Sequence, residues 1–277
     1  MSNSMPVRRR HLIIQLKKLR TAAGLSQHAV SHEMGWDRQK ILRIEAGRFQ
    51  RINSADVMAL CKLYGASEDA TRELVDIALQ SRKHKPWWFR YKEVFPGPFV
   101  SLEAEATHIQ DFTIGLIPGW FQTREYIAAL MARSADVTEE EAAQRIDFRV
   151  ERQSAVLDRD APPAIWSIID EAALRRLVGG PEVMKRQIAH LYELTKRRNI
   201  NIQVLPFDAG AHAGGTVPFV ILGFEGGTDT VVYIESPGDG FYIEAEDEIA
   251  RHKLVFDRIQ ATALSVEDSA GLLSDLA

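Results

Sequence analysis

A short segment near the N-terminus combines arginine, glutamine and lysine side chains at a spacing that suits contacts with double-stranded DNA. An arginine can donate two hydrogen bonds to guanine O6 and N7, and a glutamine can pair in the same way with adenine N6 and N7. Lysine and glutamine side chains can also bind phosphate oxygens, which fix the orientation of a protein on the duplex. We therefore predict base contacts by Arg38, Gln39 and Arg43. Phosphate contacts are predicted for Gln27 and Lys40.

Two short helices joined by a turn would position these side chains. Ser26 and Asp37 are suitable N-caps for the two helices, and Gly35 suits the turn between them. In the second helix, Ile41 and Ile44 have the spacing of a buried face. The polar side chains of that helix then project from the opposite, exposed face.

The neighbouring residues predict a domain of five helices over residues 1–80. Helices are expected at about 9–23 and 54–64, on either side of the two short ones, and a fifth begins at about 67. Before the first helix, Arg8, Arg9 and Arg10 suit an arm that contacts the sugar-phosphate backbone. They fit equally well a disordered tail that keeps the protein soluble.

Charge is distributed unevenly along the 277 residues. Residues 1–51 carry eleven lysines and arginines against three aspartates and glutamates, a local charge of +8 in a chain whose net charge is −4. The remainder is therefore strongly acidic, which indicates a polyanionic partner at one end only. The single cysteine, Cys61, excludes an intramolecular disulfide and a metal site built from cysteines. No segment approaches the roughly 18 apolar residues of a membrane span, so a cytoplasmic location is expected.

Three segments of the N-terminal region together resemble a known DNA-binding family. Residues 24–27, 30–36 and 38–47 are similar to the Cro/repressor (XRE-type) helix-turn-helix. The resemblance implies that Glu45 pairs with Arg20 inside the domain and holds the DNA-contacting helix against the first helix. On this interpretation Arg20 is structural and does not contact DNA.

Residues 81–99 interrupt the helical pattern and form a predicted linker. The segment contains three prolines and a high density of aromatic residues, which a purely polar linker would lack. Its aromatic residues are Trp87, Trp88, Phe89, Tyr91, Phe95 and Phe99. We expect them to pack against the following domain or a partner subunit.

Residues 100–277 predict a second domain that mixes helices and strands. Helices are expected at about 102–111, 123–134, 138–157, 180–197 and 245–263. Strands are expected at 164–170, 201–206, 217–224 and 230–235, and the last two have the spacing of a hairpin. The mixed order favours an α+β domain with a small, mostly antiparallel sheet.

This second domain also resembles part of a known family. The matching segments are 103–106, 117–126, 170–176, 178–181, 204–207, 209–212 and 232–235. They are similar to the DUF5753-like C-terminal domain of an actinobacterial family of regulators with an XRE-type N-terminus. Such regulators are described as antitoxin-like, since members tend to be encoded beside small partner proteins. The resemblance implies a small protein partner encoded nearby.

Several acidic residues and one histidine in this domain could support acid-base chemistry or bind a metal. They are Asp170, Glu171, His212, Glu235 and Glu244. The sequence contains no HExxH, P-loop, GxSxG or dinucleotide-binding motif in its proper context. Asp170 is explained more simply as the N-cap of a following helix. We expect no enzymatic activity, no cofactor and no metal.

Three functions remain open, in decreasing order of support. The first is a homodimeric transcriptional regulator that binds a palindromic operator and whose second domain mediates dimerisation and partner binding. Its two DNA-contacting helices would lie roughly 34 Å apart in successive major grooves. The second is a regulator that senses a small molecule, with a pocket lined by Trp120, Phe121, Trp166, Phe219 and Tyr233. The third, least favoured, is an enzyme fused to a DNA-targeting domain.

Overall fold

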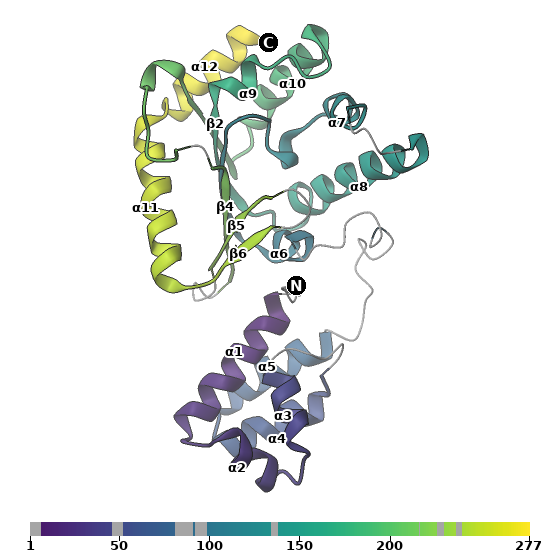
Figure 1. Cartoon of the computed structure of the whole chain (residues 1–277), viewed down its shortest axis with the longest axis vertical. Helices are drawn as coiled ribbons and strands as arrows, with labels where there is room; N and C mark the ends of the chain where they lie inside the picture. Colours follow the sequence, from purple (N-terminus) through teal and green to yellow (C-terminus); the bar gives the residue numbers. More distant parts are fainter. Residues whose placement is uncertain are drawn as a thin grey trace. The chain divides into compact units, whose positions relative to one another are not determined.

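A computed structural model describes residues 7–45, 52–80, 91, 99–133, 138–215, 217–225, 230–236 and 240–277. The chain forms two compact units, Met1–Phe89 and Arg90–Ala277, here called the N-terminal and C-terminal units (Figure 1). The boundary between them falls within the predicted linker 81–99. Of that linker, only Tyr91 and Phe99 belong to the described residues.

The N-terminal unit consists of helices in its described part, and five are seen as predicted. They are α1 (Val7–Ala22), α2 (Gln27–Glu33), α3 (Arg38–Glu45), α4 (Ser54–Tyr64) and α5 (Glu68–Gln80). The Ser26 hydroxyl accepts a hydrogen bond from the backbone N–H of Ala29 and so caps α2. Gly35 adopts a positive φ of 62° in the turn between α2 and α3, a conformation that favours glycine. The predicted core residues Ile41 and Cys61 are both buried.

The C-terminal unit contains one six-stranded sheet in its described residues. Its strands are β1 (His108–Thr113), β2 (Ala164–Asp170), β3 (Ile200–Leu205), β4 (Phe219–Gly223), β5 (Thr230–Ile234) and β6 (Phe241–Ile243). The strand order is β3-β2-β1-β4-β5-β6. β1, β2 and β3 pair in parallel, whereas β4, β5 and β6 continue the sheet antiparallel from β1.

Helices connect and cover these strands. They are α6 (Phe99–Glu105), the short 3-10 helix η2 (Gly119–Phe121), α7 (Arg124–Met131), α8 (Glu139–Leu157), α9 (Glu171–Arg175), α10 (Pro181–Leu194), the 3-10 helix η3 (Phe207–Ala209), α11 (Glu246–Thr262) and α12 (Val266–Leu276). α7 and α8 connect β1 to β2, and α9 and α10 connect β2 to β3. Such long helical crossovers return the chain in the same direction, which makes these strand pairs parallel.

Two predictions about this unit are wrong. The α+β class holds, but the sheet is neither small nor mostly antiparallel, because the helical crossovers build one half of it from parallel strands. The helix predicted at 102–111 ends at Glu105, and residues 108–113 form the central strand β1 instead. Ile109 and Phe112 lie on opposite faces of β1 and both are buried, so helices on both sides of the sheet cover this strand.

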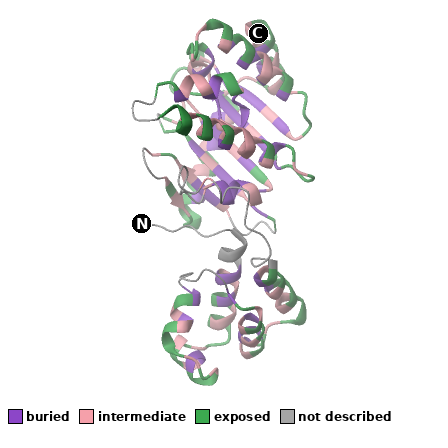
Figure 2. Cartoon of the chain, turned by 90° about the vertical axis from the view of Figure 1, so that its right-hand side faces the viewer, coloured by how far each residue is buried: buried purple, intermediate pink, exposed green. Residues whose placement is uncertain are grey.

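The two faces of the sheet are covered by different helices. Figure 1 shows α11 on one side of the sheet and α7 and α8 on the other. On the α11 side, Phe112, Ile168 and Phe219 pack with Phe256 and Ile259 of the helix. Figure 2 shows that buried residues concentrate along the strands and on the helix surfaces that face them. α11 and the opposite helices therefore form two separate hydrophobic layers with the sheet between them.

Candidate DNA-binding surface and ligand pocket

The exposed face of α3 carries the three predicted base-contacting side chains. Arg38, Gln39 and Arg43 are exposed, while Ile41 and Ile44 on the other face of the helix are buried. The Arg43 Nε–H donates to the Gln39 carbonyl at 3.3 Å, which directs the guanidinium along the helix surface. The arrangement leaves charged and amide groups available for the edges of bases.

A buried carboxylate on the inner side of α3 holds this helix against α1. Glu45 is 5% exposed, and Arg20 of α1 donates to it from Nε at 2.6 Å and from Nη2 at 3.1 Å. Arg20 also donates from Nη1 to the Leu25 carbonyl at 2.7 Å. The hydrogen bond to Glu45 raises the pKa of Arg20 above its ordinary value. The Arg20–Glu45 pair implied by the family resemblance is therefore present and bidentate.

The two side chains predicted to bind phosphate have partners within the unit. Gln27 donates from Nε2 to Glu45 at 2.7 Å and completes the set of donors around that carboxylate. The Lys40 ammonium lies 3.0 Å from Asp56 of α4 and 3.6 Å from the centre of the Trp36 ring. A phosphate contact by either residue would compete with these interactions. Asp56 lies 16 positions after Lys40, in another helix, so no local pattern predicts this pairing.

The three residues of the predicted basic arm belong to helix α1. The backbone of Arg8, Arg9 and Arg10 belongs to the first turns of α1. Their side chains lie outside the described residues. Their contact with DNA stays a prediction.

The C-terminal unit has a cavity of about 810 Å³ on the sheet face that α11 partly covers. Asn201, Trp166, Gln110 and Ile221 line it as one row, since they are register neighbours across β3, β2, β1 and β4. A second row runs alongside and contains small residues at two of its positions. It consists of Ala164, His108, Gly223 and Thr230. The absence of bulk at Ala164 and Gly223 leaves the space that forms the cavity.

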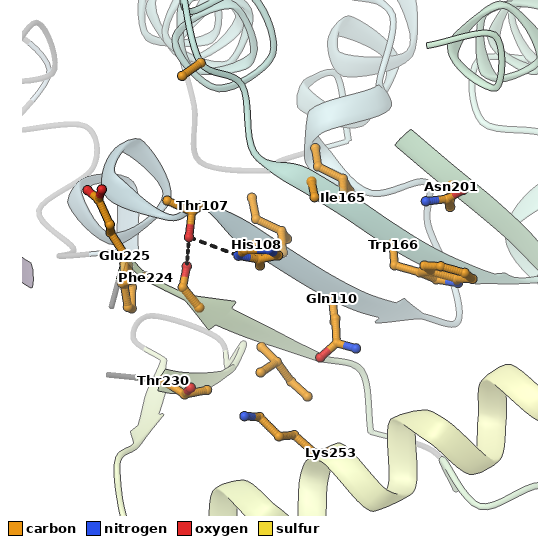
Figure 3. A pocket seen from close by; sticks show the side chains of 15 residues that line it. Thr107, His108, Gln110, Ile165, Trp166, Asn201, Phe224, Glu225, Thr230 and Lys253 are labelled. Atoms are coloured by element: carbon orange, nitrogen blue, oxygen red, sulfur yellow. Dashed lines mark hydrogen bonds between the residues drawn. The ribbon is translucent and has the colours of Figure 1, made fainter. Parts of the chain in front are cut away.

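Polar side chains in the cavity differ in how firmly they are held. Trp166 donates from Nε1 to Gln203 at 2.7 Å, which fixes its ring, and His108 Nδ1 lies 3.0 Å from the Thr107 hydroxyl. The side-chain amides of Gln110 and Asn201 make no hydrogen bond to any described residue. Figure 3 shows Gln110 and Trp166 on neighbouring strands and Lys253 extending toward the sheet from α11. The lining of the cavity thus includes the Trp166 ring, two amides, the basic Lys253 and the acidic Glu225.

Of the five residues predicted to line a pocket, Trp166 does so. Trp120 and Phe121 are buried in η2, which packs against α8 and α10. Phe219 belongs to the core beneath α11. Tyr233 stacks on Phe99, with ring centroids 4.0 Å apart. The aromatic residues other than Trp166 are therefore used for packing.

Tyr91 and Phe99 are the two aromatic linker residues that the structure describes, and both pack within the C-terminal unit. Tyr91 makes an edge contact with Phe148 of α8 at 5.2 Å and donates its hydroxyl to Glu151 at 3.1 Å. Trp87, Trp88, Phe89 and Phe95 lie outside the described residues. These contacts agree with the expected packing of the linker against the second domain.

Two of the acidic residues named as candidates for catalysis, Asp170 and Glu171, have structural hydrogen-bond partners. Asp170 accepts from the backbone N–H of Ala172 at 2.8 Å and caps α9. Glu171 accepts from the N–H of Phe207 at 3.0 Å, and this hydrogen bond lowers the pKa of Glu171. Within the described ranges, no group of three or more histidine, cysteine or acidic residues is arranged to hold a metal ion. Over the same ranges, no helix combines the length and apolar character needed to cross a membrane.

Comparisons with protein families agree with the division into two units. Residues 11–74 match a family described as a helix-turn-helix domain, and residues 97–275 match one described as a domain of unknown function, DUF5753. Comparison with curated proteins gave no match, and neither did comparison with solved structures. The first matched range contains α2 and α3, and the second contains the whole sheet.

Proposed function

The chain belongs to the DUF5753 family and is a DNA-binding helix-turn-helix regulator, and we propose that α3 contacts bases in the major groove of its operator. The observation that supports this proposal is the exposed row of Arg38, Gln39 and Arg43 on a helix held from behind by Glu45. Arginine and glutamine at such positions form bidentate contacts with guanine and adenine.

We further propose that the regulator acts as a cytoplasmic homodimer of the XRE class on a palindromic operator. Two copies of α3 would then enter successive major grooves roughly 34 Å apart. The acidic C-terminal unit would hold the dimer together and bind an antitoxin-like small partner encoded nearby. The family resemblance and the separation of a basic from an acidic region support this division of labour. No catalytic activity forms part of this proposal.

The base contacts can be tested by alanine substitution on the exposed face of α3. Arg38→Ala and Gln39→Ala are each expected to weaken operator binding by about 5- to 150-fold, since a bidentate base contact contributes roughly 1–3 kcal/mol. Binding to random DNA should change much less. Fluorescence anisotropy with operator and random duplexes at one fixed salt concentration measures both affinities.

Arg72→Ala is the matched control for this experiment. Arg72 is an exposed arginine of α5 that forms an ion pair with Asp69, one turn earlier in the same helix. Its removal lowers the charge of the same unit as much as Arg38→Ala does, without altering α3, whereas Gln39→Ala leaves the charge unchanged. If the α3 variants lose operator and random DNA binding equally, these side chains bind phosphate and do not contact bases.

The cavity favours a second candidate function, the sensing of a small molecule. Its volume of about 810 Å³ lies within the range of roughly 300–1,000 Å³ that is usual for ligand sites. The Trp166 ring and the amides of Gln110 and Asn201, which make no hydrogen bond to a described residue, suit a planar heterocycle with hydrogen-bonding groups at its edge.

Thermal unfolding of the full chain with adenine and uracil as first probes tests this function. A heterocycle that occupies the cavity at a hundred times its Kd should stabilise the protein by about 2.7 kcal/mol. Ala164→Phe is expected to abolish this stabilisation because the larger ring fills the cavity. Ala161→Ser is a milder substitution at another lining position and should preserve it. A stabilisation that survives Ala164→Phe would place the ligand elsewhere.

A further inference from the structure

Three arginines of α8 form a cluster on one side of the helix, away from the cavity. Arg145, Arg149 and Arg152 are spaced by four and three residues, so their side chains lie on the same face. α8 and α11 lie on opposite sides of the sheet (Figure 1), so the arginine cluster is separate from the cavity. Each of the three side chains is half-buried.

Only one of these arginines has a carboxylate partner at hydrogen-bonding distance among the described residues. Arg152 donates from Nε to Oε2 of Glu103 at 2.5 Å, and its Nη2 contacts the other oxygen of that carboxylate. Glu103 belongs to α6 and is fully buried. The Arg152 guanidinium also lies 5.3 Å from the centre of the Phe99 ring. Arg152 is therefore held in place by a bidentate pair and an aromatic ring.

Arg145 and Arg149 lack comparable partners. The Nε atoms of both are buried and have no hydrogen-bond partner among the residues that the structure describes. Arg149 donates from Nη1 to the neutral amide oxygen of Gln122 at 3.2 Å. Among the described residues, neither guanidinium forms an ion pair. Buried polar groups are almost always hydrogen-bonded, so two adjacent guanidinium groups with unpaired N–H donors need a physical explanation.

The charges around the cluster also leave these guanidinium groups without full compensation. Burial lowers the pKa of Arg149, the charges of Arg152 and Arg145 lower it further, and Glu235 opposes them. Among the described residues, Glu103 and Glu235 raise the pKa of Arg152, and Glu235 raises that of Arg149. An arginine stays protonated, so the cluster keeps an excess positive charge in a partly desolvated place.

We propose that Arg145 and Arg149 form a binding site for an oxyanion, the phosphate or carboxylate group of a small ligand. The planar guanidinium donates two parallel hydrogen bonds to such a group, and the unpaired N–H donors of the two residues supply them. Arg152 stays with Glu103 and adds positive charge without leaving its partner. The site belongs to the C-terminal unit and does not depend on the proposed contacts of α3 with DNA.

Thermal unfolding of the full chain in chloride, phosphate and acetate at equal ionic strength tests the proposal. Phosphate or acetate is expected to raise the Tm by several degrees relative to chloride, and phosphate against acetate shows which group the site prefers. Arg149→Gln should lose most of this shift. In chloride the same variant should unfold at an equal or higher temperature than the wild type, since an uncompensated charge has been removed.

A matched control and a second variant make the outcome decisive. Arg198→Gln removes an exposed arginine from the same unit and should keep the full shift. Arg145→Gln decides the matter if Arg149→Gln does not fold. The proposal is overturned if neither anion raises the Tm above that in chloride, or if the shift persists in the folded variants. A lower Tm of Arg149→Gln in chloride would assign Arg149 a purely structural role and overturn it as well.

Discussion

Replacement of Arg20 by alanine is expected to reduce the free energy of unfolding of the N-terminal unit by about 3 kcal/mol, because it leaves a buried carboxylate without its cation. Glu45 is 5% exposed and, of its hydrogen bonds with described residues, would retain the one from Gln27. The Leu25 carbonyl would lose its donor as well. For a unit of this size, such a loss corresponds to a decrease in Tm of 10 °C or more, at roughly 4–8 °C per kcal/mol.

Hydrogen exchange of the full chain measures this effect in the N-terminal unit alone. Amides of α1 and α3 should exchange faster in Arg20→Ala, whereas amides of the C-terminal sheet should keep their protection. The double variant Arg20→Ala with Glu45→Gln should recover part of the lost stability. Lys18→Ala, at an exposed position of the same helix, is the control. Unchanged protection combined with weaker DNA binding would identify Arg20 as a DNA contact.

The second large effect concerns a carboxyl group buried in the centre of the C-terminal sheet. Asp111 of β1 is 5% exposed and accepts a hydrogen bond from the Ser167 hydroxyl at 2.8 Å. Burial raises the pKa of Asp111 from 3.8 to about 7, opposed by the hydrogen bond from Ser167, and the nearby charge of Glu103 raises it further. The folded protein therefore holds this proton at pH values where the unfolded chain releases it.

The sign of the pH dependence follows from this raised pKa. The contribution of Asp111 to stability is complete below pH 3.8, the pKa of the unfolded chain, and is lost as the pH rises through about 7. The loss is on the order of 4 kcal/mol, since each pKa unit corresponds to about 1.36 kcal/mol. Above that range the folded state contains a buried, ionised carboxylate.

Asp111→Asn removes this titration and keeps a side chain of the same shape. Relative to the wild type, the variant should become more stable between pH 5 and pH 8, as measured by urea unfolding of the full chain at several pH values. Asp208→Asn, at an exposed position in η3, should follow the wild type throughout. Parallel pH profiles of the wild type and Asp111→Asn would show that Asp111 is ionised in the folded protein at pH 5.

The sequence predicted the N-terminal unit well because its determinants are local. Caps such as Ser26, glycines such as Gly35 and a buried stripe through Ile41 lie within a few residues of what they specify. The interaction of Lys40 with Asp56 escaped prediction because it joins two helices whose packing angle the sequence does not state.

In the C-terminal unit, single elements were more predictable than their arrangement. The strand at 164–170 and the helix at 138–157 have clear periodicity, and they form β2 and α8 with nearly the expected bounds. β1 was predicted as helix because its short segment contains too few residues to separate the two periodicities. Strand direction depends on which helices connect the strands across the sheet. These connections involve the whole unit, so a local pattern in the sequence does not predict them.

Most of the residues that form the cavity could not be predicted from the sequence. The sequence predicts a pocket lined by aromatic residues, yet Phe219 packs in the core and Tyr233 stacks on another ring. The space itself comes from small residues, Ala164 and Gly223, which the strand register places side by side with His108 between them. Register over three strands decides this arrangement, so a local pattern in the sequence does not reveal it.

The position of β1 in the sheet has a consequence for how the chain acquires its structure during synthesis. β1 is complete when residue 113 has emerged, but its two neighbours come from residues 164–170 and 219–223. The N-terminal unit relies on contacts between helices that follow one another closely, and such units fold early and fast. In a nascent chain, the N-terminal unit is thus expected to be folded while the sheet of the C-terminal unit still lacks strands. During that interval, the DNA-binding N-terminal unit is folded without the C-terminal unit that is proposed to regulate it.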